Sequence, residues 1–406
     1  MSTTMFAGLL LAAGCSGADP SADAAEIRPF AIRVDEADLA DLRSRLERTR
    51  FPDQIPNSGW EYGVPVDYMR ELVTHWRQRY DWRGWENRLN ALPQFKTTID
   101  GLEIHFVHVR SKHAQATPLV LTHGWPGSFM EFYKTIGPLT DPEAHGGKAE
   151  DAFHVVVPSL PGFGFSQAPV EPGWSVNRMA GVVATLMGRL GYERYGAQGG
   201  DWGAGVTRWL GTYDAEHCVG AHLNFLGGGG RTGEDAWVGV PPAERERFER
   251  RNKELENQKA YGAIQGSRPL TLGYALNDSP AGLAAWIVDK FWAWSDHAGD
   301  LDNSFSKDEL LTNVMVYWIT KTGPTSARIY FERNPYTGER KAGAAPIGYI
   351  QFPKEINVLP RKWVEDQLGA RLIHYSAAPR GGHFAALEQP DLLVEDVRAF
   401  FRKTRK

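Results

Sequence analysis

An aspartate stands at the centre of a glycine-rich turn in the segment Gly199-Gly200-Asp201-Trp202-Gly203. A short apolar strand is expected before it at 195–198 and a helix after it, which is the setting of a nucleophile elbow. Such a sharp turn requires very small neighbours, because larger side chains would collide. A carboxylate at the apex, where serine is usual, predicts attack on saturated carbon. Taken alone, the motif would equally suit a plain turn in which Asp201 caps a helix.

Two backbone amides are expected to stabilise the negative oxygen that this chemistry creates. The segment His123-Gly124-Trp125-Pro126-Gly127 follows a predicted strand at 118–122. In hydrolases with such an elbow, this loop gives one N–H of the oxyanion hole, and the residue after the nucleophile gives the other. We therefore expect the amides of Trp125 and Trp202 to form the hole.

The remaining members of a catalytic triad are predicted near the end of the chain. His383 follows a predicted strand at 371–377 and is assigned as the general base, and Glu355, just past a predicted strand at 347–352, is preferred as its orienting acid. The order nucleophile, acid, histidine matches hydrolases with this elbow. Two rival carboxylates fall in a predicted helix, and a third is close enough to His383 for a local structural bond: Glu365, Asp366 and Glu388.

An aspartate nucleophile indicates a substrate whose saturated carbon carries a leaving group, either an epoxide or a carbon–halogen bond. Epoxide opening creates an alkoxide that needs a proton, and the phenols of Tyr261 and Tyr330 are the preferred donors. A departing halide needs only weak donors, so the indoles of Trp125 and Trp202 keep that alternative open. Three other tyrosines are rivals for the phenol role: Tyr274, Tyr317 and Tyr336.

The elements predicted around these residues describe an α/β protein with a mostly parallel sheet. Apolar strands alternate with helices from about residue 118, and Asp100-Gly101 joins two strands of a hairpin at 95–109. Apolar residues at helical spacing predict a helix that Asp35 begins, a second over Met69 to Trp76, and an amphipathic helix at the C-terminus that carries Leu393, Val397, Phe400 and Phe401. Between about 227 and 345 strand signals give way to helical ones, with Ser279-Pro280 opening one helix and Ser306 to Glu309 forming a capping box. The predicted units are an extension at 1–26, an N-terminal wrapping domain at 27–117, a core at 118–226 and 346–406, and a helical lid at 227–345.

Composition describes a globular protein that acts on a small molecule. Hydrophobic residues make up 42% of the chain, charged residues 23%, and the formal net charge of −4 is spread along it. No basic surface for nucleic acid is therefore expected. Cys15 and Cys218 are the two cysteines, too few for a disulfide framework or a zinc cluster, so we expect no metal and no cofactor.

The first residues contain an apolar run, Met5 to Ala13, followed by Gly14-Cys15. The run is too short to span a bilayer and is similar to a bacterial lipoprotein signal, so we expect an exported, lipidated protein. No basic residue precedes it, which favours the alternative of a cytoplasmic protein with an irregular extension. Membrane attachment is expected only if Cys15 is lipidated, and a homo-oligomer is left open.

The chain resembles epoxide hydrolases of the α/β-hydrolase fold, on the microsomal-type branch with an extra N-terminal domain. The likeness extends from about residue 28 onward. The motifs that carry it are IRPFAIRV, DLRSRLERTRFPD, HGWPGS, PSLPGFGFS, GGDWG, YGAIQGSRPLTLGYALNDSPAGLAAWI, ARIYFE, FPKEI and GGHFAALEQP. This resemblance implies Asp201 as nucleophile, His383 as base and Glu355 as its partner, with Tyr261 and Tyr330 as the phenols that bind and protonate the epoxide oxygen.

The function predicted from the sequence is the trans addition of water to an oxirane, through an ester on Asp201, to give a vicinal diol. Haloalkane dehalogenation with the same nucleophile is the first alternative. A non-catalytic protein that keeps the scaffold as a ligand receptor is the second, since a fold does not secure a function.

Overall fold

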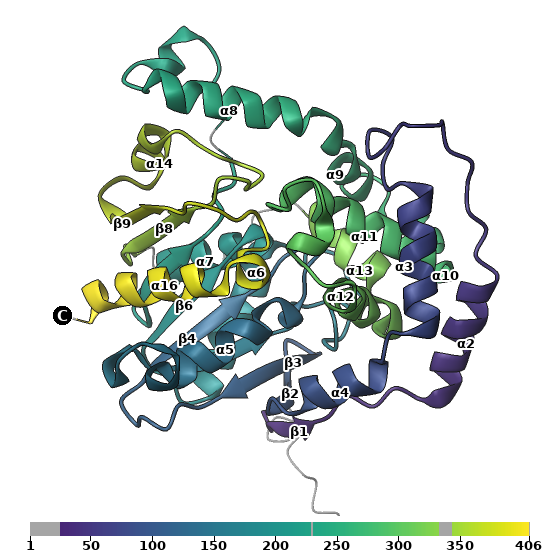
Figure 1. The fold of residues 1–406 in the computed structure, drawn as a ribbon. Coiled ribbons are helices and arrows are strands. Elements are labelled where there is room, and N and C mark those ends of the chain that lie inside the picture. The colour runs from purple at the N-terminus through teal and green to yellow at the C-terminus, as the bar shows by residue number, and fades with distance from the viewer. Residues whose placement is uncertain (1–24, 229, 333–342, 406) are drawn as a thin grey trace, which may run out of the picture.

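A nine-stranded sheet forms the centre of the computed structural model, which describes residues 25–228, 230–332 and 343–405 (Figure 1). The strand order is β1-β2-β3-β5-β4-β6-β7-β8-β9. Strands β4 to β9 are parallel to one another. Strands β1, β2 and β3 form antiparallel pairs at one edge, where β3 pairs with β5. The strands are β1 (Arg28–Phe30), β2 (Gln94–Ile99), β3 (Leu102–Val109), β4 (Thr117–Thr122), β5 (Phe153–Pro158), β6 (Tyr195–Gly199), β7 (Cys218–Leu223), β8 (Ile347–Gln351) and β9 (Leu372–Ala377).

The strands predicted from apolar runs are confirmed to within two residues at each end. Parallel strands covered on both faces need apolar side chains throughout, and every residue of β6 and β8 is buried. The predicted hairpin is also confirmed: Asp100 and Gly101 form its two-residue turn, both at positive φ (49° and 77°). The three-residue edge strand β1 carries no comparable pattern and was not predicted.

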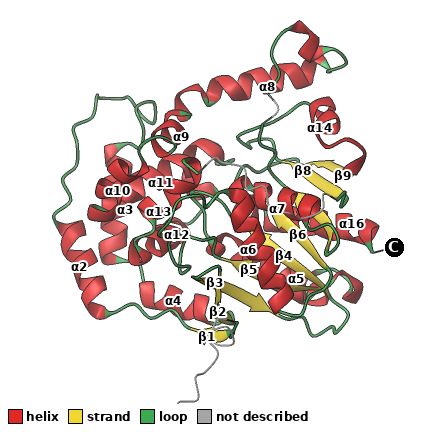
Figure 2. Ribbon diagram, turned by 180° about the vertical axis from the view of Figure 1, so that it is seen from behind, coloured by secondary structure: helices red, strands yellow, loops and turns green. Residues whose placement is uncertain are grey.

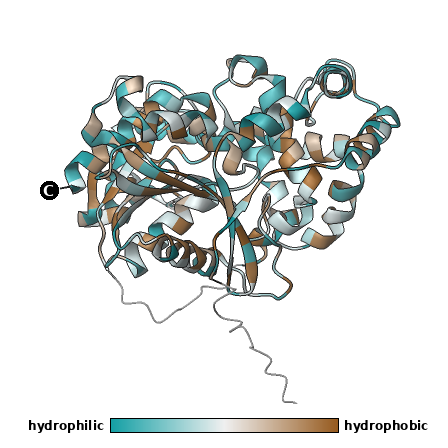
Figure 3. Cartoon of the chain, turned by 90° about the horizontal axis from the view of Figure 1, so that it is seen from below, coloured by the Kyte–Doolittle hydropathy of each residue, from teal (hydrophilic) through white to brown (hydrophobic). Residues whose placement is uncertain are grey.

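Helices cover both faces of the sheet, and Figure 3 shows hydrophobic residues concentrated along the strands between them. Helices α5 and α16 pack together on one side, and α6 and α7 on the other. The predicted C-terminal helix is confirmed as α16, which buries Leu393, Val397, Phe400 and Phe401. These helices are α5 (Tyr133–Thr140), α6 (Val176–Arg189), α7 (Asp201–Tyr213), α14 (Arg361–Leu368), α15 (Ala385–Glu388) and α16 (Pro390–Thr404).

In residues 25–93, three helices precede the hairpin: α2 (Glu36–Glu47), α3 (Val66–Gln78) and α4 (Trp82–Asn90). The two predicted helices correspond to α2 and α3, and their apolar positions are buried, as the spacing predicts. Asp35 occupies the N-cap position of α2, but its side chain makes no capping hydrogen bond. Helices α2 and α3 pack against helices inserted much later in the chain, α11 and α12.

Between β7 and β8, the described residues 230–332 are mostly helical, as predicted, and we refer to the six α-helices found there as the insertion (Figure 2). They are α8 (Pro242–Glu254), α9 (Ala260–Gln265), α10 (Pro269–Asp278), α11 (Pro280–Trp294), α12 (Lys307–Thr320) and α13 (Gly323–Ala327). The predicted capping signals are present: Ser279 accepts the Gly282 amide, and Ser306 and Glu309 form a reciprocal capping box. The boundaries of the predicted domains remain predictions.

Short 3-10 helices complete the chain. They are η1 (Phe129–Phe132), η2 (Pro142–His145), η3 (Ala149–Asp151), η4 (Glu234–Trp237), η5 (Glu256–Gln258), η6 (Leu301–Asn303), η7 (Arg328–Tyr330) and η8 (Gly369–Arg371).

Residues 1–24, including Cys15 and nearly all of the predicted extension, lie outside the described residues. Within the described ranges, none of the helices has the length and apolar character needed to cross a membrane. The same ranges contain no group of three His, Cys, Asp or Glu side chains able to hold a metal ion, and Cys218 is a buried free thiol.

The capping box at the start of α12 provides a test of the fold. Ser306→Ala removes the oxygen that accepts the Glu309 amide at 3.2 Å, and we expect it to lower the free energy of unfolding by about 1 kcal/mol. Urea unfolding measures the change. Ser306→Thr keeps the oxygen and should stay close to the unaltered protein; equal stability of the alanine variant would contradict the assigned cap.

Candidate active site

The elbow holds Asp201 in a backbone conformation that few residues adopt. Asp201 begins α7 just beyond the end of β6, and its φ of 47° lies in the left-handed region, at a cost of about 1–3 kcal/mol. Glycines make the turn possible. A Cβ on Gly199 would lie 2.4 Å from the carbonyl oxygen of Gly203, and a Cβ on Gly203 would lie 2.0 Å from that of Thr122.

The three side chains predicted as a triad lie in contact, with His383 between the two acids. His383 Nε2 is 3.4 Å from Asp201 Oδ2, and His383 Nδ1 is 2.6 Å from Glu355 Oε1. Glu355 is fully buried, and its Oε1 also accepts the Ile356 amide at 2.5 Å. The arrangement holds the imidazole with one nitrogen toward each carboxylate.

The charges around His383 determine its protonation. Burial alone lowers the pKa of this imidazole, but the charge of Glu355, the hydrogen bonds to Asp201 and Glu355, and the charge of Asp201 together raise it well above its ordinary value. These contacts favour the protonated imidazole between the two acidic side chains.

The rival acids have other partners. Glu388 accepts the backbone amides of Phe384 at 2.9 Å and Asp296 at 2.8 Å, which is the local structural role predicted for it. Glu365 and Asp366 lie on α14 and pair with basic side chains there. None of the three contacts the imidazole of His383 by a hydrogen bond or ion pair in the described chain.

The loop after β4 reaches the nucleophile through a backbone amide. The N–H of Trp125 donates to Asp201 Oδ1 at 2.8 Å, so this carboxylate has one oxygen in the predicted hole and the other toward His383. Among the described residues, a bond of this kind is recorded for Trp125 but not for Trp202. Trp202 lies in the first turn of α7, where helical N–H groups have no partner within the helix.

Helix α12 of the insertion holds the same loop. Asn313 Nδ2 donates to the carbonyl of Pro126 at 2.8 Å, and Tyr317 donates its O–H to the carbonyl of Gly127 at 2.6 Å. Ser128 donates to Asn313 Oδ1 at 2.9 Å. The position of the Trp125 amide therefore depends on the insertion as well as on the sheet.

The two preferred phenols come together above the elbow. The hydroxyl groups of Tyr261 and Tyr330 are 3.4 Å apart, the Tyr261 ring stacks on Trp125, and the Tyr330 ring meets Trp202 edge-on. Burial raises the pKa of both phenols, and the charge of Asp201 raises each further. Both are therefore protonated and able to donate over the range in which enzymes work.

The rival tyrosines differ in position. Tyr274 is 75% exposed on α10, and the hydroxyl of Tyr317 donates to the carbonyl of Gly127. Tyr336 lies outside the described residues.

Arg251 of α8 supports the loop that carries Glu355, and this role was not predicted. This buried guanidinium donates to three carbonyl oxygens: those of Lys354 at 2.6 Å, Glu355 at 2.9 Å and Ala293 at 3.1 Å. Arg251 therefore joins the loop that carries Glu355 to the end of α11. Its partner carbonyls are more than forty residues away, so no local pattern could have identified it.

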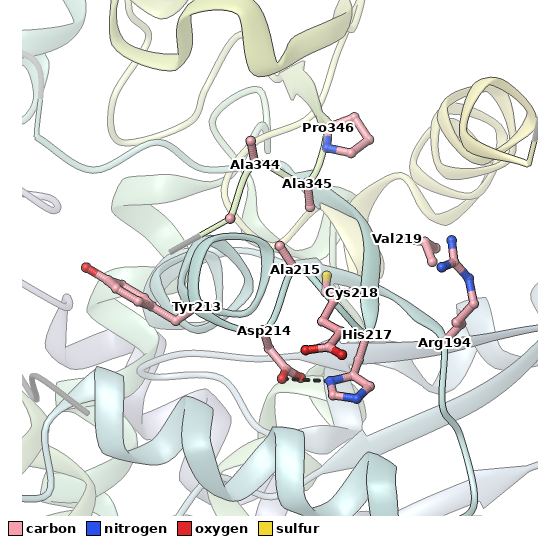
Figure 4. Close-up of a pocket in the computed structure, with 12 residues that line it drawn as sticks. Arg194, Tyr213, Asp214, Ala215, His217, Cys218, Val219, Ala344, Ala345 and Pro346 are labelled. Carbon is pink, nitrogen blue, oxygen red and sulfur yellow. Dashed lines mark hydrogen bonds and ion pairs between the residues drawn. The ribbon is translucent and has the colours of Figure 1, made fainter. Parts of the chain in front are cut away.

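The described residues also border a large cavity away from this site. A hollow of about 810 Å³ opens at the amino ends of the parallel strands, bordered by Arg194, Cys218 and Pro346, with Asp214 and His217 hydrogen-bonded beside it (Figure 4). The predicted site residues are at the carboxyl ends, where ligands of open α/β sheets bind. A much smaller cavity, of about 10 Å³, adjoins Asp201 there.

Comparison with known proteins defines the class of the fold. The model of the α/β-hydrolase fold matches residues 117–223, and that of the epoxide hydrolase N terminus matches residues 27–132. The structure of juvenile hormone epoxide hydrolase from the silkworm Bombyx mori superposes with a TM-score of 0.85, at 32% identity over 95% of this chain and 96% of that one. The protein thus has the α/β-hydrolase fold.

Whole-length relatives identify the family. Epoxide hydrolase 1 of Oryctolagus cuniculus is 39% identical over 92% of this chain and 88% of its own length. A Stigmatella aurantiaca protein, itself named only as a candidate epoxide hydrolase, is 46% identical over 93% of this chain and 86% of its own. The chain belongs to the epoxide hydrolase family. Nothing in these comparisons favours the haloalkane dehalogenase alternative.

The glycine contacts at the elbow generate a prediction. Gly203→Ala places a methyl group against the backbone carbonyls of Thr122 and His123, which are not flexible side-chain ends that could move away, so the free energy of unfolding should fall by about 3 kcal/mol and activity with it. Gly181→Ala in α6 is the matched control, because nothing lies within 4 Å of its added methyl; it should raise stability by about 0.5–1 kcal/mol. Thermal unfolding of both variants measures the two changes in stability. A stable and active Gly203→Ala variant would contradict the close approach of Gly203 to the Thr122 carbonyl.

Proposed function

We propose that this epoxide hydrolase adds water to an oxirane through a covalent ester on Asp201, with trans opening to a vicinal diol. The observation that supports this best is the division of the Asp201 carboxylate: Oδ1 accepts the Trp125 amide, and Oδ2 is left beside His383 and open to attack carbon. Serine has one side-chain oxygen, so it could not place one oxygen in the oxyanion hole and attack carbon with another.

In the first step, Asp201 Oδ2 attacks one oxirane carbon while the carbon–oxygen bond breaks. The departing oxygen takes a proton from Tyr261 or Tyr330, whose neutral hydroxyl groups are 3.4 Å apart and can bind one oxygen between them. The products of the step are an alkyl ester that carries a neutral hydroxyl group, and one phenolate.

Formation of the ester removes the negative charge of Asp201. That charge and its hydrogen bond are among the causes that hold the pKa of His383 high, so the pKa falls when the ester forms. The imidazolium can then return a proton to the phenolate. His383 becomes a neutral base at the stage at which a base is needed.

In the second step, water attacks Cγ of the ester and gives one proton to His383 Nε2. The negative charge develops on Oδ1, which already accepts the Trp125 amide, and the Trp202 amide is proposed as the second donor. The Cγ–Oδ2 bond breaks, the second water proton ends on the diol, and the carboxylate and imidazolium are restored. The new oxygen of Asp201 comes from water.

The substrate is proposed to be a small apolar epoxide. Aromatic rings surround the phenols, with Trp125 and Trp294 both stacked or tilted against Tyr261, and such walls favour apolar ligands. We propose that the protein does not bind nucleic acid. Membrane attachment through Cys15 and assembly into a homo-oligomer remain predictions from the sequence.

Removal of the nucleophile or the base should have different results. Asp201→Asn cannot form the ester, so turnover of styrene oxide should fall below detection. His383→Gln should still alkylate and then stall, because no base activates the water; mass spectrometry of the quenched protein should find an adduct on the peptide carrying Asp201.

A single turnover in ¹⁸O-labelled water tests the same route. The label should enter Asp201 and not the diol. A diol that takes up the label directly, with Asp201 unlabelled, would rule out the covalent step.

Loss of both phenols separates epoxide opening from halide release. Tyr261→Phe and Tyr330→Phe should each slow alkylation by about 10²-fold or more, since each removes a proton donor. Tyr274→Phe, a change at an exposed phenol, is the control and should leave the rate unaltered. Release of halide from a haloalkane by the double phenylalanine variant, with no diol from epoxides in the unaltered protein, would instead support dehalogenation.

A receptor that keeps the scaffold without catalysis is the remaining alternative. It needs neither a base nor proton donors, whereas His383, its acid and both phenols here are within contact distance of their partners. This completeness supports an enzyme.

A further inference from the structure

Glu131 is a carboxyl group at the site to which the proposed steps give no role. It belongs to η1, directly after the loop that carries Trp125. Its side chain bends back over that loop: Oε1 lies 1.2 Å from where a Cβ of Gly127 would be. The carboxyl group thus occupies space that is open only because residue 127 has no side chain.

The bend brings Glu131 to the cavity of about 10 Å³ beside the nucleophile. Asp201, Asn224 and His383 border the same cavity, which therefore has polar groups on several sides. About 10–15 Å³ of accessible space is what one water molecule needs, together with two to four polar partners. The cavity meets both conditions for a single water.

The carboxyl group of Glu131 has no other bond to account for its position. In the described chain its side chain makes no hydrogen bond and no ion pair with protein. Asn224, by contrast, has its Oδ1 engaged by Gln198 Nε2 at 2.8 Å, and its amide group faces Gly200 at the rim of the cavity. A carboxyl group that borders the same cavity as Asp201 and His383, and that has no partner of its own in the described chain, is suited to hold a water molecule there.

We propose that Glu131 positions the hydrolytic water, by accepting one of its hydrogens while His383 takes the other during attack on the Asp201 ester. The inference rests on the proposed function, since it concerns its second step. His383 takes one hydrogen of the water. The hydrogen that points to Glu131 stays on the incoming oxygen and passes to the departing diol oxygen when the Cγ–Oδ2 bond breaks.

The protonation of Glu131 supports this division of roles. Burial raises its pKa to about 8, with the charges of Asp201 and Glu355 adding to the effect and that of His383 opposing it. At neutral pH the group is mostly a neutral acid, whose carbonyl oxygen accepts a hydrogen bond without competing for the proton. The base is then His383 alone.

The test compares the two half-reactions with styrene oxide under single-turnover conditions, with rapid quenching and mass spectrometry of the ester on Asp201. Glu131→Leu should slow ester hydrolysis about 100-fold, the order expected when a reactant is misplaced, and leave alkylation within about threefold. Glu131→Gln keeps a neutral carbonyl acceptor and should retain hydrolysis within about tenfold. The leucine variant should therefore accumulate ester.

Gly127→Ala provides a second variant that leaves the glutamate itself unchanged. The added methyl would occupy the place of Oε1 and displace a flexible side chain, so hydrolysis should slow selectively here as well. Equal loss of both half-reactions in the two variants, or unaltered hydrolysis in Glu131→Leu, overturns the proposal.

His383→Gln distinguishes failure of this inference from failure of the proposed function. If that variant accumulates ester and Glu131→Leu does not, the role of Glu131 is wrong and the covalent route stands. If diol forms in the unaltered protein and no variant accumulates ester, the covalent route itself is wrong.

Discussion

One imidazole lies between two carboxylates, and the proposed chemistry depends on keeping it there. His383 has Glu355 at 2.6 Å on one side and Asp201 at 3.4 Å on the other. The shorter contact is to Glu355, which is fully buried, and the longer one is to Asp201, the proposed nucleophile. The difference allows the imidazole to stay oriented while one of its neighbours changes charge.

Four carboxyl groups lie around this imidazole, and two of them contact it while two do not. Burial raises the pKa of Glu131 to about 8 and that of Glu388 to about 7, so neither is fully ionised at neutral pH. Asp201 and Glu355 contact the imidazolium directly. Such a separation of nearby titratable groups allows one site to carry out both nucleophilic and acid–base steps.

Much of this arrangement could be predicted from the sequence because it follows from topology. Parallel strands bring their carboxyl ends to one edge of a sheet, so residues just after β6, β8 and β9 must meet there. That rule was enough to prefer Glu355 over Glu365 and Asp366, which the structure finds paired on α14. Apolar runs likewise gave the strands, since buried parallel strands have no polar face.

The parts that were missed depend on contacts between distant segments or on space that no side chain fills. Arg251 acts on an acid loop 104 residues later. Glu131 reaches the cavity only because Gly127 leaves room, which no periodicity reveals. Asp35 has the residue type and position of a cap but no capping bond, since propensity alone does not determine where a side chain turns.

The insertion is tied to the core at both halves of the site, through α12 to the loop after β4 and through Arg251 to the loop after β8. It cannot swing away as a rigid cap without disturbing the nucleophile's amide and the acid's backbone together. Ligands must then enter by local movements of loops and side chains. A chimaera that takes these helices from a relative would also need the residues that bind the loops after β4 and β8. Without them, the Trp125 amide and the Glu355 backbone would lose the hydrogen bonds that hold their loops.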